Sequence, residues 1–110
     1  MKDIYKGTLY EDNIVSPRMI DGARLYNLAT QTKVDMVMQV GGKCDIDGTK
    51  NEDGEYNLFN IRLKPSATAA IPQGIYNLEL FSVDEDNNPI IEAYYTNFAR
   101  VLESSFRNDY

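Results

Sequence analysis

The sequence predicts an all-β domain, folded as an antiparallel β-sandwich of about seven short strands. Apolar residues alternate with other residues in several segments, and this two-residue period is that of a pleated strand. Turn-forming residues separate the segments, and none of them has a convincing helical pattern. A chain of 110 residues accommodates one hydrophobic core but not two. We therefore expect one sandwich domain over residues 1–102 and a C-terminal tail over residues 103–110.

The N-terminal part predicts two short strands followed by an ambiguous segment. The strands are expected from Ile4 to Tyr10 and from Asn13 to Ile20, with Asp21-Gly22 as a strong turn signal after them. The apolar residues between Met19 and Leu28 also allow a helix. Gly22 argues against that helix, because glycine in a helix interior costs about 1 kcal/mol relative to alanine.

The clearest strand runs from Thr32 to Val40 and is followed by Gly41-Gly42. We expect the two glycines to end the strand, because glycine favours turn conformations. The alternation places four side chains on one face, which we expect to point into the core: Val34, Met36, Met38 and Val40.

The segment between Cys44 and Glu55 is rich in Asp, Gly, Asn and Lys, and predicts a mobile, exposed loop. Its oxygen-bearing side chains invite comparison with a calcium loop. The EF-hand pattern fails, because a register that starts at Asp47 puts Glu52 where glycine is required. The acidic segment Asp84–Asn88 fails likewise, so we interpret both segments as turns.

The second half of the chain predicts further strands. One runs from Glu55 to Leu63, and Pro65 ends it before a bridge of small residues, Ser66–Ala70. Another lies between Ile71 and Val83. Six side chains of these two strands are expected in the core: Phe59, Ile61, Leu63, Tyr76, Leu78 and Leu80.

A hairpin is expected at the C-terminal end of the domain. The turn Asp84–Pro89 leads into the strand segments Ile90–Tyr95 and Asn97–Leu102. Tyr94 and Tyr95 are adjacent in this strand, so one of them must point away from whichever face is buried. An outward tyrosine is typical of interfaces, and we expect an interface there.

Two segments together resemble a known family. Asp21–Leu28 leads into the Val34–Val40 strand, and Ile71–Leu80 is followed by an acidic turn and a closing strand, Phe98–Val101. This succession resembles the small immunoglobulin-like β-sandwich domains of tailed-phage virion proteins, such as capsid-decoration proteins and the N-terminal domain of baseplate upper proteins. The resemblance extends from about Ile4 to Leu102. It implies an immunoglobulin-like sandwich and a structural role in a bacteriophage virion.

The resemblance also implies a structural corner at the start of a late strand. In such sandwiches a Pro-x-Gly-x-Tyr segment sets a turn, and the tyrosine hydroxyl reaches back to loop backbone. The matching residues here are Pro72, Gly74 and Tyr76. Antibody-type domains are excluded, because the chain has no tryptophan and a single cysteine, Cys44. A baseplate upper protein would also carry a fibre extension after Leu102, which is not seen here.

The composition argues against catalysis. Histidine is absent, which removes the commonest general base and transition-metal ligand. Cys44 has no base to activate it, and we interpret it as incidental. Paired carboxylates could hydrolyse glycosides, but the acidic clusters fall in expected loops and the chain lacks tryptophan as a sugar platform. We expect no enzymatic activity, no catalytic residue, no cofactor and no metal.

Charge and termini bear on partners and location. With 17 acidic and 11 basic residues the net charge is −6, and no basic cluster exists, so nucleic acid and membranes are not expected as partners. Met1–Lys6 lacks the apolar run of a secretion signal, so we expect synthesis in the host bacterial cytoplasm. Phe106 and Tyr110 lie in a polar tail without an obvious core to join, and we expect them, with Tyr94 and Tyr95, at an interface.

The expected function is therefore that of a non-enzymatic virion protein that acts through protein–protein contacts. A small capsid auxiliary or decoration subunit is the leading interpretation, and a head–tail connector or a baseplate or fibre-attachment subunit is the alternative. Expected partners are other virion proteins, such as a capsid or tail protein, and further copies of the chain. Because Tyr94 could stack on a sugar ring, a carbohydrate-binding or adhesion module remains a further alternative.

Overall fold

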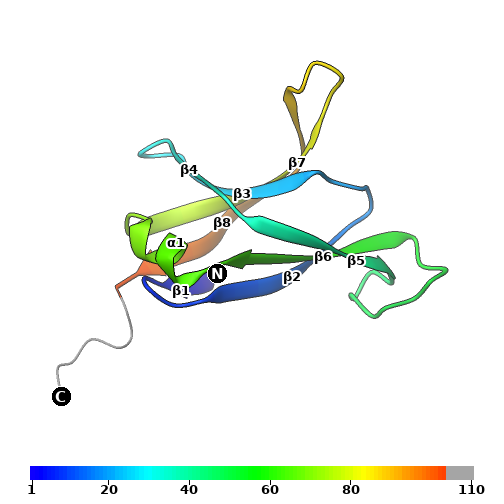
Figure 1. Cartoon of the computed structure of the whole chain (residues 1–110), viewed down its shortest axis with the longest axis horizontal. Coiled ribbons are helices and arrows are strands. Elements are labelled where there is room, and N and C mark those ends of the chain that lie inside the picture. Colours follow the sequence, from blue (N-terminus) through cyan, green and yellow to red (C-terminus); the bar gives the residue numbers. More distant parts are fainter. Residues whose placement is uncertain (104–110) are drawn as a thin grey trace.

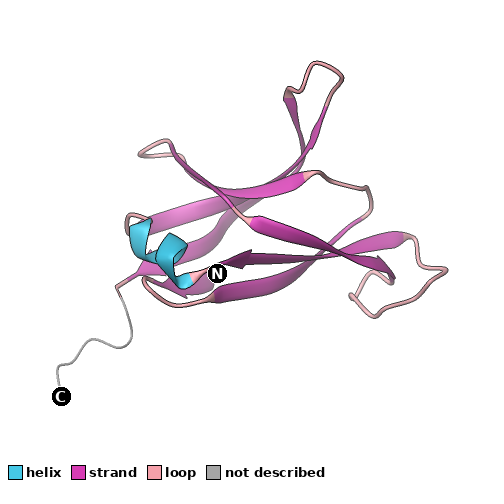
Figure 2. Ribbon diagram, viewed as in Figure 1, coloured by secondary structure: helices cyan, strands magenta, loops and turns pink. Residues whose placement is uncertain are grey.

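The computed structural model describes residues 1–103 and contains eight strands and one short helix within them (Figures 1 and 2). Phe106 and Tyr110 lie outside the described residues. In chain order the elements are β1 (Lys2–Tyr5), β2 (Tyr10–Ser16), β3 (Gly22–Asn27), β4 (Thr32–Asp35), β5 (Val37–Cys44), β6 (Tyr56–Leu63), α1 (Pro65–Ala70), β7 (Gly74–Val83) and β8 (Pro89–Leu102).

The strands form two sheets, which confirms the all-β prediction. One sheet has five strands in the order β1-β8-β7-β3-β4, and the other has three in the order β2-β6-β5. β3 is a strand, so the alternative helix between Met19 and Leu28 is wrong. The apolar pattern of this segment is compatible with both a helix and a strand. The pairing of β3 with β7, which starts at Gly22↔Phe81, holds it as a strand.

One strand pair departs from the expected antiparallel arrangement. β1 runs parallel to β8, from Lys2↔Ala99 to Tyr5↔Leu102, so the five-stranded sheet is mixed. The prediction of a purely antiparallel sandwich is wrong for this pair. Antiparallel neighbours follow most directly from tight hairpins, whereas β1 and β8 lie at opposite ends of the described chain and no short turn sets their direction.

The expected strand Thr32–Val40 is shared between the two sheets. β4 pairs with β3 in the larger sheet, and β5 pairs with β6 in the smaller one. The change of sheet occurs at Met36, whose backbone N–H donates to the carbonyl oxygen of Ala23 at 3.0 Å. Met36 is buried, and Val34 and Met38 pack against the core, as predicted. This strand therefore ties the layers together at one side of the sandwich.

Two predictions about the end of that strand are wrong. Val40 is 59% exposed. It lies opposite the buried Phe59, and so on the core-facing side, but β5 is an edge strand and leaves that side open. Gly41-Gly42 does not end β5, which continues to Cys44. A register shift between Val40 and Gly42 absorbs the glycines as a bulge, with Gly42 at φ +93°.

The core lies between the two sheets, and six predicted core residues are buried in it: Phe59, Ile61, Leu63, Tyr76, Leu78 and Leu80. β6 ends before Pro65, as expected, but the bridge of small residues after it is the helix α1. Proline is tolerated at the start of a helix, which accounts for this beginning. Thr68 of α1 is fully buried, and its hydroxyl donates to the Thr8 carbonyl oxygen at 2.7 Å. The helix therefore closes one end of the sandwich.

Candidate functional site

The ends of β7 and β8 form a hairpin that extends beyond the two sheets (yellow in Figure 1). Its turn carries the predicted acidic segment, in which Asp84 Oδ1 accepts the backbone N–H groups of Asp86 and Asn88 at 2.9 and 2.8 Å. The carboxylates of this turn thus have a backbone role. We refer to the part of the hairpin from Phe81 to Tyr95 as the arm.

The arm exposes large apolar and aromatic side chains. Isolated exposed hydrophobic residues are ordinary, but several of them on one hairpin make it a candidate interaction element. Five side chains of the arm are between 40% and 47% exposed, and we call this set the arm surface: Val83, Ile90, Ile91, Tyr94 and Tyr95.

Tyr94 and Tyr95 lie on opposite faces of the larger sheet, as adjacent strand residues must. Tyr94 is opposite Glu79, on the outer face, and Tyr95 is opposite Leu78, on the core-facing side. Both are more than 40% exposed. Tyr94 is exposed because it points outward, as its adjacency to Tyr95 predicted for one of the two, whereas Tyr95 is exposed because the three-stranded sheet does not cover the whole of the five-stranded one.

A hydrogen-bond chain orients the Tyr94 side chain. The backbone N–H of Asn97 donates to Asn77 Oδ1 at 2.8 Å, and this fixes which end of the Asn77 amide is the acceptor. The Nδ2 group of Asn77 then donates to the Tyr94 hydroxyl oxygen at 2.6 Å. Because the hydroxyl accepts this bond, its own proton can be donated to a bound partner.

The base of the arm is held by residues that the sequence did not single out. On the outer face, Arg24 Nε lies 2.6 Å from Glu79 Oε1, and the Arg24 guanidinium stacks 5.4 Å from the centre of the Phe81 ring. The ring lies against Gly22, where an added Cβ would come within 2.5 Å of it. Glycine is therefore needed at this point for close approach rather than for a turn.

The preceding segment bonds the arm at its base. The Asp21 carboxylate accepts the backbone N–H of Val83 at 2.8 Å. Glu92 accepts from the Ser82 hydroxyl at 2.9 Å and pairs with Arg18 at 3.3 Å. The expected turn signal at Asp21 is thus an attachment point for the arm. Only the pairing of β3 with β7 brings these residues together.

The predicted structural corner lies at the other end of β7. Tyr76 is fully buried, and its hydroxyl donates to the Pro72 carbonyl oxygen at 2.8 Å. This is the contact that the resemblance implied. Gly74 has φ +150°, and an added Cβ would meet Asn27 Nδ2 at 2.8 Å. Burial raises the pKa of the Tyr76 hydroxyl, because ionisation would place a charge in the core.

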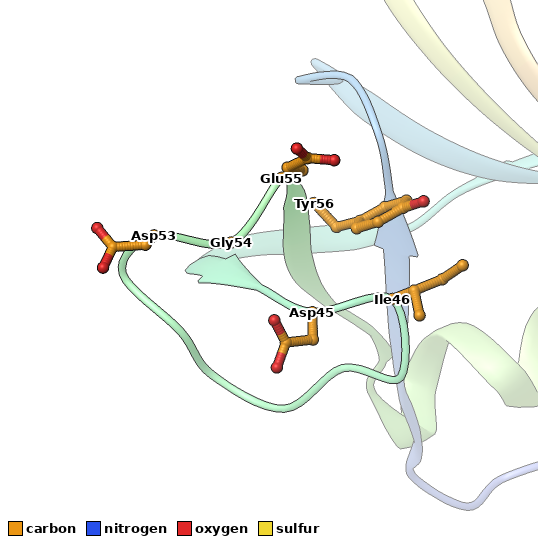
Figure 3. A pocket seen from close by; sticks show the side chains of 6 residues that line it. All are labelled: Asp45, Ile46, Asp53, Gly54, Glu55 and Tyr56. Carbon is orange, nitrogen blue, oxygen red and sulfur yellow. The ribbon is translucent and has the colours of Figure 1, made fainter.

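A hollow of about 310 Å³ lies in the β5–β6 loop, beside Tyr56 (Figure 3). The carboxylates of Asp45, Asp53 and Glu55 point in different directions there. Asp45 Oδ1 accepts from the Asn51 side chain at 3.0 Å. Within residues 1–103, no group of three or more acidic or cysteine side chains is placed to hold a metal ion. The loop around the hollow is therefore stabilised by hydrogen bonds among its own polar groups.

Asp47 in the same loop also stabilises a turn through its side chain. Its Oδ1 accepts the backbone N–H of Thr49 at 2.9 Å, and this bond lowers the pKa of the Asp47 carboxyl. Cys44 ends β5 and is fully buried as a free thiol. Neighbouring Lys43 donates to Asn57 Oδ1 at 3.1 Å. β5 ends and β6 begins at the expected limits of this loop.

A second, open hollow of about 720 Å³ lies on the larger sheet below the arm. Its lining includes uncharged amide and hydroxyl side chains: Asn27, Thr30, Gln73, Asn77, Thr96 and Asn97. Two of the amides already have partners in the fold. Asn27 Oδ1 accepts the backbone N–H groups of Ala29 and Thr30, and Asn77 bonds Tyr94 and Asn97.

Comparison with known proteins places the chain in no family. No family model matches the sequence, and no curated protein or solved structure matches it. Among residues 1–103, no helix has the length and apolar character needed to cross a membrane. The arm and the corner are therefore the features of the molecule that bear on its function.

Proposed function

We propose that the chain is a non-enzymatic structural subunit of a tailed-phage virion, and in the first place a small capsid auxiliary or decoration protein. The arm surface carries this proposal, because five half-exposed apolar and aromatic side chains lie on a well-anchored hairpin whose turn end extends beyond the two sheets. Aromatic residues are enriched at protein interfaces, and burying such a group on a partner is favourable. The proposed partners are a capsid or tail protein and further copies of the chain.

We also propose that the sandwich is immunoglobulin-like. The bond from the Tyr76 hydroxyl to Pro72 supports this, since such corners recur in that architecture. The mixed sheet made by β1 and β8 is a departure from a purely antiparallel pattern. The proposed location is the virion, after synthesis in the bacterial cytoplasm.

Particle incorporation tests the proposed role. Particles would be purified from a bacterial strain that carries the gene, and the ratio of this chain to the major capsid protein measured by quantitative mass spectrometry. We expect a fixed ratio for the wild type. Tyr95→Asp on the arm should abolish incorporation, whereas Val40→Asp should not, because Val40 is exposed on a different strand. A folded wild-type chain that never associates with particles would exclude the proposal.

The same experiment separates the positions within the virion. A decoration subunit would be present in a ratio close to that of the capsid protein. A head–tail connector or a baseplate or fibre-attachment subunit would be present in few copies per particle and would remain with isolated tails or connectors.

A carbohydrate-binding or adhesion module is the second candidate. The second hollow favours it, because its lining combines uncharged amide and hydroxyl groups with apolar side chains such as Ile75, and Asn77 in the lining bonds the Tyr94 hydroxyl. A glycan array tests this function. Binding that is lost in Tyr94→Ala and kept in Tyr95→Ala would favour the module, and no binding at high protein concentration would remove it.

A further inference from the structure

β8 is an edge strand over much of its length, although it lies inside the five-stranded sheet. β1 covers only the part of β8 from Ala99 to Leu102. Between Pro89 and Ala99, β8 pairs with β7 through Ile90, Ile91 and Ala93–Tyr95, with register shifts at Glu92 and over Thr96–Phe98. On its other side this part of β8 has no strand of the described residues. An uncovered edge presents unpaired backbone N–H and C=O groups, and these can pair with another extended chain.

Charged side chains, which often block such pairing, are nearly absent from this edge, although β-bulges interrupt it at Glu92 and at Thr96–Phe98. Charged side chains protect two of the outer strands, since β2 carries Glu11 and Asp12 and β4 carries Lys33 and Asp35. The uncovered part of β8 carries a single charged residue, Glu92.

Glu92 does not protect the edge, because its carboxylate is held by Ser82 and Arg18. The edge strand β5 is also uncharged from Val37 to Gly42, but it exposes two large apolar side chains where the arm exposes five.

Resting on the proposed assembly role, we propose that the uncovered edge of β8 pairs antiparallel with the same edge of a second copy. The limits of the edge make it self-complementary. It begins after Pro89, which has no N–H to donate, and it ends before Ala99, where Lys2 of β1 begins. Its middle residue is Tyr94. A two-fold axis through Tyr94 therefore pairs the regular segment Ala93–Tyr95 of one copy with the same segment of the other.

The side-chain faces agree with this register. Tyr94 of one copy lies opposite Tyr94 of the other on the outer face, and Ala93 lies opposite Tyr95 on the core-facing side. Like faces thus meet, as an antiparallel ladder requires. Aromatic cross-strand pairs of this kind stabilise sheets. The pairing would join two five-stranded sheets into one and bury the exposed rings.

Charges at the ends of the paired edges are complementary. The acidic turn of one copy, Asp84–Asp86, precedes the start of its own edge and would come next to the start of β1 in the other copy. Lys2 begins that strand and keeps a side chain that is 55% exposed, although it pairs with Asp12. Opposite charges at both ends favour this register over a slipped one.

Cysteine cross-linking tests the register directly. Residues directly opposite in an antiparallel pair have Cα atoms about 4.5–5.5 Å apart, within the range that a disulfide spans. Under mild oxidation we expect Tyr94→Cys to form an intermolecular disulfide dimer. Val40→Cys is the matched control, since Val40 is exposed on β5, and should remain monomeric on a non-reducing gel. Cys44 is fully buried and stays in place in both variants.

Sedimentation velocity of the full chain over a concentration series provides the second measurement. We expect a monomer–dimer equilibrium whose dissociation constant rises at least about tenfold in Ile91→Lys, because the lysine places a charge on the paired edge. Val40→Lys should retain the wild-type constant. Far-UV circular dichroism on both variants separates lost pairing from lost folding.

Two outcomes would overturn the inference: a wild-type chain that is monomeric at every concentration, or a dimer that cross-links through Val40→Cys and not through Tyr94→Cys. Monomeric chains that still enter particles would remove the β8 pairing and leave the proposed function standing. Dimers that never enter particles would remove the proposed function and leave the β8 pairing standing.

Discussion

The half of the β7–β8 hairpin beside the core and the half that forms the arm differ in what covers them, although both follow the strand pattern. In the first half, Tyr76, Leu78 and Leu80 are fully buried beneath the smaller sheet. In the second, Val83, Ile90 and Ile91 are between 40% and 47% exposed. The same hydrophobic character therefore stabilises the fold in one place and is left available for a partner in the other.

The two halves also differ in how their polar groups are used. Near the core, polar groups close a corner, as the bond from Tyr76 to Pro72 does. At the base of the arm, Arg24 and Glu79 form a pair on the outer face, with Phe81 stacked on the guanidinium. The first arrangement stabilises the sandwich, and the second holds the arm in place. Substitutions in the two halves should therefore have different consequences.

The largest expected effect comes from a cavity in the core half. Leu78→Ala should lower the free energy of unfolding by about 2–5 kcal/mol, because Leu78 is fully buried. Ile91→Ala, the matched change on the arm, should cost less than about 1 kcal/mol, since Ile91 is half-exposed. Urea denaturation followed by circular dichroism measures both. Equal losses would show that the arm contributes to the folding core as much as the other half of the hairpin does.

Gly74→Ala tests the corner itself. We expect a loss of about 1–3 kcal/mol, because φ +150° is nearly restricted to glycine and an added Cβ would meet Asn27. Gly7→Ala is a control with positive φ but open space around it, and should cost less. If thermal unfolding shows the two variants to be equally stable, close packing at the corner does not matter.

High pH should weaken the sandwich through buried phenols. Burial raises the pKa of Tyr10, which the Asp12 carboxylate raises further, and burial also raises the pKa of Tyr76. Their contribution to stability is complete below about pH 10, the ordinary tyrosine value, and is lost as the pH rises above it. The free energy of unfolding should then fall by up to about 1.4 kcal/mol per pH unit for each group.

Tyr10→Phe and Tyr76→Phe identify the groups responsible for that slope. Each should make the loss of stability above pH 10 shallower, and the double variant should make it shallower still. Denaturant titrations at a series of alkaline pH values measure the slopes. Identical slopes in all variants would assign the alkaline loss to other groups.

The smallest expected effects come from two hydroxyl deletions. Tyr76→Phe removes the bond from the buried Tyr76 side chain to the Pro72 carbonyl oxygen and should cost about 0.5–1.5 kcal/mol near neutral pH. Tyr94→Phe removes a bond to Asn77 on the half-exposed arm and should cost about 0.5 kcal/mol or less. Parallel thermal melts compare the two. A larger loss in Tyr94→Phe would mean that the arm hydroxyl has a structural role.

Much of the local structure could be predicted from the sequence. Alternation located β6 and β7 and the residues that they bury, such as Phe59 and Leu80. Asp and Asn marked the turns because their side chains bond nearby backbone, as Asp47 and Asp84 do. These predictions succeed because the relevant contacts lie within a few residues along the chain.

The candidate site was predictable only in part. Tyr94 followed from its adjacency to Tyr95, but the anchors of the arm did not, since Arg24 and Glu79 lie far apart in sequence. Gly22 resembled a turn residue, although it makes room for the Phe81 ring. Contacts of this kind depend on strand pairing, which the local pattern does not specify.

By itself, the sequence determined that the chain alternates like a β protein, where it turns and which strand faces are apolar. Tertiary structure decided the change of sheet at Met36, the parallel pairing of β1 with β8 and the exposure of Val40. It also decided that Ala99–Leu102 of β8 has β1 as a second neighbour, whereas the rest of β8 has only β7 among the described residues. The physical reason is that alternation sets the direction of a side chain, whereas burial and pairing depend on distant segments that cover it.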